Sequence, residues 1–119
     1  MRGSSIPFYK YQGTGNDFII ADAFHNIIPD LSQEQIGKMC HRKYGVGADG
    51  FMILYPHDDY DFEMVYYNSD GRRSTMCGNG GRCLAHLASS VLNKNKLNFI
   101  AVDGPHTALV ENDIVRLSM

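Results

Sequence analysis

The chain has 119 residues, of which 44% are apolar and 20% are charged, and its formal net charge is −2 at pH 7. This length is typical of one domain and is sufficient for one hydrophobic core. The 11 Lys and Arg residues are scattered, which argues against a nucleic-acid-binding surface. No apolar run approaches the roughly 20 residues that span a membrane, so we expect neither a nucleic-acid nor a membrane partner.

Residues 1–5 carry one charge and are not followed by an apolar stretch, so they resemble an expression leader rather than a secretory signal. The remaining residues, 6–119, are expected to form a single lobe. Three cysteines, an odd number, occur without an Asn-x-Ser/Thr glycosylation site. We therefore expect a cytoplasmic protein with reduced thiols.

Hydrophobic periodicity and turn residues predict nine elements along the chain. Ser32 and Gln35 have the spacing of a capping box, which predicts a helix at 33–42. A second helix follows Cys77 and lacks charged residues from position 83 to 93, which indicates a central place in the core. Strands are predicted at 8–11, 18–23, 51–55, 61–67, 97–102, 106–111 and 114–119, with hairpin turns at 103–104 and 112–113. The expected fold class is α+β, a curved and mostly antiparallel sheet wrapped around the central apolar helix.

The loop at 45–50 matches the letters G-x-G-x-x-G. A dinucleotide site requires the order strand, loop, helix, whereas here the loop lies between a helix and a strand. Nucleotide binding is therefore disfavoured. Two interpretations remain, a tight glycine-dependent connection or a loop whose backbone amides line a polar ligand site.

Cys77 stands at the start of the central helix, followed by Gly78, Asn79, Gly80 and Gly81. The positive end of the helix dipole and the free N–H groups of a first turn stabilise a thiolate and can also hold a carboxylate. The alternative is that the glycines serve only the turn that leads into the helix. We favour a reactive base beside an anion site.

The other cysteines, Cys40 and Cys83, fall on apolar helical faces and are expected to be buried and inert. The five histidines show no metal-ligand spacing, so no metal site is expected. His86 on the central helix is expected to be exposed or hydrogen-bonded rather than catalytic. The turns at 15–17 and 68–71 contain Asn and Asp, which are common in turns, but together with Cys77 they could converge on one amino-acid-like ligand.

Four stretches, 10–18, 42–50, 68–71 and 76–82, fall in the order and spacing of the diaminopimelate epimerase family, and the chain resembles the N-terminal half of that family. Proline racemases are similar around the cysteine but show histidine after Cys-Gly, so Asn79 favours the diaminopimelate branch.

The resemblance implies an isomerase that converts LL-diaminopimelate to the meso form without a cofactor, in lysine and peptidoglycan precursor synthesis. Two cysteines exchange the proton at the α-carbon, and Cys77 matches one of them. Asn16 and Asn68 match substrate-binding asparagines, and Gly78 and Asn79 match amides that hold the ends of the amino acid.

Members of the family have a second lobe that carries the partner cysteine, and no second Cys-Gly-x-Gly run occurs here. The expected partner is that second lobe or a second copy of this chain, and the chain alone is expected to be inactive. The alternatives are a non-catalytic lobe that binds substrate or self-associates, and a proline racemase-like isomerase. Against the family pattern, Arg72 and Arg73 stand where many members have a small polar and an acidic residue, and Gly50 stands where some members have a glutamine that contacts substrate.

Overall fold

A computed structural model describes residues 7–13, 15–75 and 78–118. The expectations for residues 1–5, Cys77 and Met119 lie outside these ranges. The elements in chain order are β1 (Phe8–Gln12), β2 (Asp17–Asp22), α1 (Gln33–Cys40), β3 (Gly50–Tyr55), β4 (Phe62–Asn68), β5 (Arg73–Ser74), α2 (Gly78–Leu92), β6 (Lys96–Ala101), β7 (Gly104–Glu111) and β8 (Ile114–Ser118).

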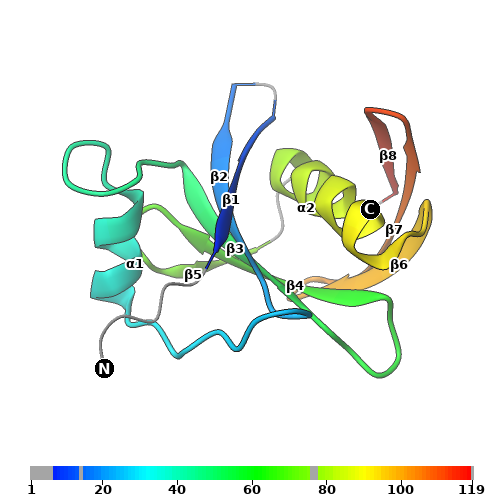
Figure 1. Ribbon diagram of the computed structural model, residues 1–119, viewed down its shortest axis with the longest axis horizontal. Helices are drawn as coiled ribbons and strands as arrows, with labels where there is room; N and C mark the ends of the chain where they lie inside the picture. The colour runs from blue at the N-terminus through cyan, green and yellow to red at the C-terminus, as the bar shows by residue number, and fades with distance from the viewer. Residues whose placement is uncertain (1–6, 14, 76–77, 119) are drawn as a thin grey trace.

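The strands form one sheet in the order β1-β2-β3-β4-β6-β7-β8, with β5 paired to β4. Neighbouring strands are antiparallel except for the parallel pairs β2–β3 and β4–β6. Figure 1 shows the sheet curling around α2, with β1 and β2 on one side of the helix and β7 and β8 on the other. The predicted α+β fold, a curved and mostly antiparallel sheet around a central helix, is confirmed.

The inner face of the sheet packs against α2 and forms the larger hydrophobic cluster. Alternation along β4 turns Phe62, Met64 and Tyr66 to this face, as the sequence predicts, and Leu84 of α2 is fully buried against them. Burial of such side chains stabilises each by about 1.5–3 kcal/mol. The other buried members are Phe18, Ile20, Met52, Leu54, Cys83, Ala85, Leu87, Ala88, Leu97, Phe99, Ala101, Ala108 and Val110.

The outer face of β2, β3 and β4 packs against α1, so both faces of these strands are covered. Ile36 and Cys40 of α1 are buried there, and Met39 is partly buried. The capping box is present, because the Ser32 hydroxyl accepts from the Gln35 amide at 3.0 Å and the Ser32 amide donates to the Gln35 side chain at 2.8 Å.

The helix α1 ends at Cys40, two residues earlier than the sequence predicts, because the following loop folds back onto its last carbonyls. The amides of Val46 and Gly47 donate to the Met39 carbonyl, and the amide of Ala48 donates to that of Cys40. Gly45 is required at this contact, since a Cβ there would lie 2.1 Å from the Lys38 carbonyl oxygen. The loop is therefore a tight connection that caps α1, and these amides are not available to a ligand.

Element ends differ from the sequence prediction by one or two residues, and one strand, β5, was not predicted. Gly104 pairs with Ala101, so the β6–β7 turn consists of residues 102–103 rather than 103–104. The two-residue strand β5 is too short to give a periodic signal. The β7–β8 turn at 112–113 is confirmed, with Asn112 in the left-handed region at φ 57°.

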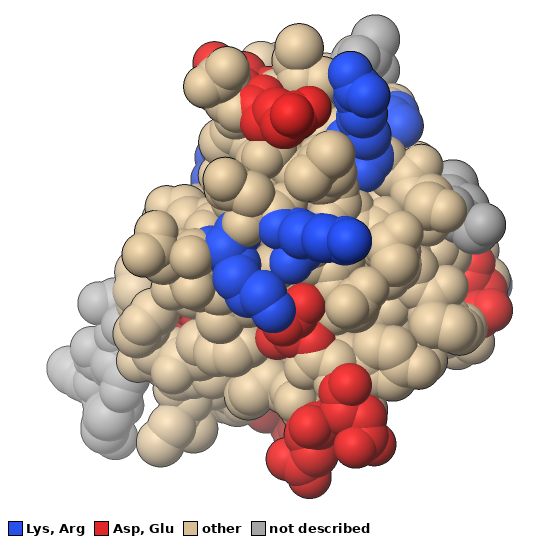
Figure 2. Space-filling model, turned by 90° about the vertical axis from the view of Figure 1, so that its right-hand side faces the viewer, with Lys and Arg blue, Asp and Glu red and all other residues tan. Residues whose placement is uncertain are grey.

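Charges of both signs share the surface on the β6–β8 side of the sheet. Figure 2 shows Lys and Arg side chains gathered at the centre of this face with Asp and Glu side chains above and below them. Just before β6, Lys94 pairs with Asp61 at 2.6 Å, and on β8 Arg116 lies 4.0 Å from Glu111. Among the described residues, no helix has both the length and the apolar character needed to cross a membrane.

Candidate active site

Two of the residues expected to bind substrate lie in direct contact at the first turn of α2. Asn79 belongs to that turn, and Asn16 belongs to the hairpin turn between β1 and β2. The Asn79 side-chain amide donates to the side-chain carbonyl of Asn16 at 2.7 Å. The hairpin is held close to the helix, since a Cβ on Gly13 would lie 3.4 Å from the Asn79 Cβ and from the Cys83 Sγ.

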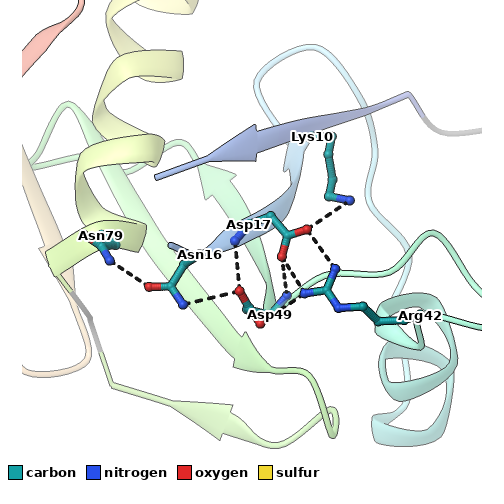
Figure 3. A network of polar contacts seen from close by, with 6 residues as sticks. All are labelled: Lys10, Asn16, Asp17, Arg42, Asp49 and Asn79. Atoms are coloured by element: carbon teal, nitrogen blue, oxygen red, sulfur yellow. Dashed lines mark hydrogen bonds and ion pairs between the residues drawn. The ribbon is translucent and has the colours of Figure 1, made fainter. Parts of the chain in front are cut away.

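A network of charged groups continues from Asn16 away from the helix (Figure 3). The Asn16 amide donates to Oδ2 of Asp49 at 3.3 Å, and the backbone N–H of Asp17 donates to the same oxygen at 3.0 Å. Arg42 donates two hydrogen bonds to Asp17, at 2.9 and 2.7 Å, and one to Oδ1 of Asp49 at 3.1 Å. Lys10 lies 3.3 Å from the Asp17 carboxylate. These contacts fix the position of Asn16 relative to the sheet.

The paired cations keep the Asp17 carboxylate charged. Hydrogen bonds from Arg42 hold the pKa of Asp17 well below its usual range, Lys10 acts in the same direction, and burial opposes the shift. The same contact raises the pKa of Arg42. The Asp17 side chain is 14% exposed, so this ion pair is better shielded from water than an ordinary surface pair.

The first turn of α2 is suited to an anionic ligand. It contains no acidic side chain that would compete for its N–H groups. Arg82 adds a positive charge one turn into the helix and donates to the Asn79 side-chain carbonyl. Because the helix dipole is also positive at this end, a carboxylate would be stabilised here by backbone N–H groups and by charge.

Asn68 lies at the end of β4 and is exposed, and the structure does not bring it into the Asn16–Asn79 contact. Its backbone N–H donates to the Arg72 carbonyl and its carbonyl accepts from Gly71, both at 2.9 Å, which closes the turn at 68–72. Asn68 pairs with Gly50, which pairs with Phe18. It therefore stands two strands, about 10 Å, from β2.

Gly50 leaves no space for a side chain at its position. A Cβ there would lie 2.6 Å from Cε1 of Tyr66 and 2.9 Å from the Tyr67 carbonyl oxygen. The Tyr66 ring therefore occupies the space that a larger residue at position 50 would need. Arg73 in β5, one of the two arginines after the Asn68 turn, lies with its guanidinium carbon 5.8 Å from the centroid of the Tyr67 ring, so it packs on the sheet.

Cys77 lies outside the described residues, whereas the other two cysteines are buried as expected. Burial raises the pKa of Cys40 to about 11, which makes it a poor nucleophile near neutral pH. Cys83 is 6% exposed and contributes to the wall of a hollow beside α2.

This hollow, about 290 Å³, lies over α2 between β1 and β8. His86 is held within its wall, because its Nδ1 is 3.1 Å from the Tyr11 hydroxyl and its Nε2 is 3.5 Å from Asp113. The expectation of a hydrogen-bonded histidine is confirmed. Burial, and then the neighbouring Cys83, raise the pKa of Tyr11. The lining residues are Tyr11, Gln12, Gly13, Asn79, Arg82, Cys83, His86, Asp113 and Val115.

Sequence reasoning did not identify Arg42, Asp49 and Arg82 as parts of the site. Arg42 lies before the glycine-rich loop and Asp49 lies within it, and their partner Asp17 is 25 and 32 residues away, so no local pattern signals the contact. In the sequence, the acidic Asp17 next to Asn16 is the feature that suggests a cationic partner close to this turn. Within the described ranges, no cluster of three His, Cys, Asp or Glu side chains could hold a metal ion.

Comparison with known proteins identifies the family that this sequence matches. The family model for diaminopimelate epimerase matches residues 8–116. The chain is 55% identical over 116 residues to a diaminopimelate epimerase of Flavobacterium psychrophilum and 43% identical over 116 residues to that of Campylobacter lari. Both alignments cover 96% of this chain and 45% of the relative, so the chain spans about half the length of the curated relatives it matches.

Solved structures share the fold at low sequence identity. A methylitaconate-delta-isomerase superposes with a TM-score of 0.66 at 14% identity, covering 93% of this chain and 62% of that protein. A Bacillus anthracis phenazine biosynthesis protein of the PhzF family superposes with a TM-score of 0.59 at 18% identity, covering 94% of this chain and 38% of that protein. These likenesses support the fold described for this chain.

Proposed function

Since the chain belongs to the diaminopimelate epimerase family, we propose that it is the lobe of such an enzyme that holds one α-amino-acid end of diaminopimelate and one of two proton-transferring cysteines. The reaction inverts one α-carbon of LL-diaminopimelate to give the meso form. It supplies lysine and peptidoglycan precursor synthesis in the cytoplasm, and it uses neither a cofactor nor a metal.

The observation that carries the proposal is the contact between Asn16 and Asn79. Two amide side chains, 63 residues apart, meet at 2.7 Å beside the first turn of α2, which directly follows Cys77 in the sequence. Amide groups there can donate to a carboxylate and accept from an ammonium group, which are the two charged groups on an α-carbon. Gly78 brings no side chain of its own to this turn, and the Arg82 guanidinium lies 3.5 Å from the place where its Cβ would stand. We assign the N–H groups of Gly78 and Asn79 to the carboxylate. Asn68 is assigned to the substrate from the family resemblance.

The proton transfer requires a base on one face of the α-carbon and an acid on the other. In the proposed step, the Cys77 thiolate removes the α-proton, so that the C–H bond breaks and an S–H bond forms. The electron pair left on carbon is delocalised into the carboxylate, where helix N–H groups stabilise the added negative charge. A thiol of the second lobe then donates its proton to the opposite face, which forms the new C–H bond and leaves a thiolate.

The charges around the first turn support both roles of this segment. A helix N-terminus lowers the pKa of a thiol placed on it, because the dipole and N–H groups favour the thiolate. The absence of acidic residues in the first turn and the positive charge of Arg82 act in the same direction. The same features bind the carboxylate of the substrate, so one segment provides the base and orients the α-carbon.

The second thiol and the remainder of the site are assigned to a second lobe. The relatives are about twice as long as the aligned segment, and Cys40, the last residue of α1, is buried against the outer face of the sheet. A symmetric pair of two copies is the alternative partner. Concentration-dependent light scattering distinguishes a self-associating lobe from one that requires the remainder of the enzyme.

The test is to fuse this chain to the C-terminal remainder of the Flavobacterium psychrophilum relative and to follow LL-diaminopimelate in deuterated solvent by NMR. We expect deuterium at one α-carbon together with formation of the meso isomer. Cys77→Ala removes the base and should slow this exchange by a factor of about 10² or more. Cys40→Ala is the matched control, because it removes a buried thiol from another part of the fold.

Exchange at the wild-type rate in Cys77→Ala would contradict the proposal. So would a folded fusion protein that binds no diaminopimelate. The chain without the second lobe should bind the substrate weakly and exchange no α-proton, and full exchange by the chain alone would contradict the assignment of the second thiol to another lobe.

A further inference from the structure

Asp49 determines which way the Asn16 amide faces. A carboxylate only accepts hydrogen bonds, so the side of Asn16 that meets Asp49 Oδ2 at 3.3 Å must be its NH2 group. The carbonyl of Asn16 is then turned to Asn79, whose NH2 group donates to it at 2.7 Å. One contact fixes the orientation and the other is compatible only with that orientation (Figure 3).

Asp49 is itself held from three directions. Its backbone N–H donates to the Asp17 carbonyl at 2.9 Å, and its Oδ2 accepts from the Asp17 backbone N–H at 3.0 Å. Its Oδ1 accepts from Arg42 at 3.1 Å, and Arg42 is anchored by two hydrogen bonds to the Asp17 carboxylate. The carboxylate of Asp49 thus links the Arg42–Asp17 ion pair to the Asn16 amide in the β1–β2 turn.

We propose that Asp49, held by Arg42, is a positioning residue that presents Asn16 to the ligand in one amide orientation. The orientation leaves the second N–H of Asn16, which has no partner within the described residues, as a donor for an acceptor such as the substrate carboxylate. With the amide reversed, Asn16 would present a carbonyl oxygen to Asp49 and would repel it. This inference rests on the proposed function, because it assigns Asn16 to the same ligand.

The Asp49 carboxylate accepts hydrogen bonds from both Asn16 and Arg42. The substitution Asp49→Asn prevents the side chain from accepting both at once without changing its size. If the carbonyl of the new amide replaces Oδ2, its NH2 group faces the Arg42 guanidinium. If the carbonyl replaces Oδ1, the NH2 group of the new amide faces the NH2 group of Asn16. The first arrangement loses the anchoring contact from Arg42, and the second sets one NH2 group against another at Asn16. Because neither arrangement keeps both contacts, the orientation of Asn16 is less firmly fixed in this variant.

The test is titration of the ¹⁵N-labelled 119-residue chain with LL-diaminopimelate, followed through backbone and side-chain amide signals. We expect Asp49→Asn to weaken binding by about 5- to 10-fold, the equivalent of one lost hydrogen bond. Arg42→Gln leaves Asp49 intact but releases its anchor, and should weaken binding by about 2- to 3-fold. Asp61→Asn is the matched control, since Asp61 pairs with Lys94 and accepts from the Asn98 backbone on another part of the sheet.

A structural role alone would lower the melting temperature of Asp49→Asn without changing the dissociation constant of the folded protein. Equal dissociation constants for the wild type and a folded Asp49→Asn overturn the inference alone. If Asp49→Asn does not fold, an unchanged constant in Arg42→Gln overturns it. A wild-type chain that shows no affinity overturns the proposed function, and with it the inference.

Discussion

The Asn79 side chain, in the first turn of α2, donates a 2.7 Å hydrogen bond to Asn16 in the β1–β2 hairpin turn. This contact joins the edge hairpin of the sheet to the start of the helix that the sheet encloses (Figure 1). The hairpin turn that carries Asn16 and the helix turn that carries Asn79 are therefore linked by a hydrogen bond. A change in one of them is expected to alter the other.

A double-mutant cycle measures this link. We expect Asn16→Ala and Asn79→Ala to be coupled by about 0.5–1.5 kcal/mol in the free energy of unfolding, the usual net value of one hydrogen bond. Urea denaturation of the wild type, both single variants and the double variant gives the coupling. Additive effects, with no coupling between the two sites, would show that the contact contributes nothing to stability.

The Asp17–Arg42 pair should make the stability of the protein sensitive to acid. The pKa of Asp17 is lowered in the folded state, chiefly by Arg42, so the folded protein resists protonation of this carboxyl more than the unfolded chain does. Stability from this group is therefore present above the ordinary Asp range, about pH 4, and is lost as pH falls below it. Asp17→Asn removes this contribution.

Urea denaturation between about pH 7 and about pH 3, on either side of the ordinary Asp range, provides the measurement. The wild type should be more stable than Asp17→Asn at neutral pH, and the difference should begin to shrink as the pH approaches about 4 and fall further below it. Arg42→Gln removes the partner of Asp17, so adding Asp17→Asn to that variant should change the free energy of unfolding by less than it does in the wild type. A gap between wild type and Asp17→Asn that stays constant over the whole range would be inconsistent with an ionised, paired Asp17.

The fold could be predicted because its main signals are local. Alternation in β4 turns Phe62, Met64 and Tyr66 to one face, and the charge-free stretch of α2 marks a helix with no large solvent-exposed face. The end of α1 could not be predicted, because it depends on the amides of Val46 and Gly47 reaching back to Met39. That contact is a property of the loop conformation and leaves no periodic pattern.

The candidate site was predictable only in part for the same reason. Asn16 and Asn79 stand in recognisable turn and helix-start contexts, and the fold brings them together. Asn68 has a similar turn context, yet the sheet register places it two strands from β2. Asp49 was hidden in a glycine-rich loop whose letters suggested a backbone role, while its side chain links Arg42 to Asn16.

The close approach of Gly50 to Tyr66 gives a prediction about stability. Gly50→Ala should lower the free energy of unfolding by about 1–3 kcal/mol, because the new Cβ would lie within 3 Å of the Tyr66 ring and of the Tyr67 carbonyl in a packed core. Gly37→Ala is the control, since its Cβ would make an ordinary 3.4 Å contact with the Asp70 carbonyl oxygen. In the middle of α1 that change should be neutral or stabilise by up to about 1 kcal/mol.

Urea denaturation of both variants checks the pair. Equal stability of Gly50→Ala and the wild type would mean that the Tyr66 ring can move away at little cost. The space at position 50 would then be open to a larger side chain, and the glycine there would have no packing cause.

Thiol reactivity provides the last prediction and separates the cysteine proposed as base from a buried one. Burial raises the pKa of Cys40 to about 11, so only about one part in a thousand is thiolate at pH 8, and the thiol is also buried between α1 and the sheet. A thiol whose pKa is lowered by a helix N-terminus is largely ionised at about pH 7.5. Iodoacetamide at that pH should therefore modify Cys77 at least about 100-fold faster than Cys40 in the folded chain, as read by peptide mass spectrometry.

In concentrated urea both cysteines should react at similar rates, because the helix and the core are lost. Similar rates in the folded chain would argue that Cys77 is not activated by the start of α2, and would remove the base from the proposed mechanism while leaving the asparagine contact intact.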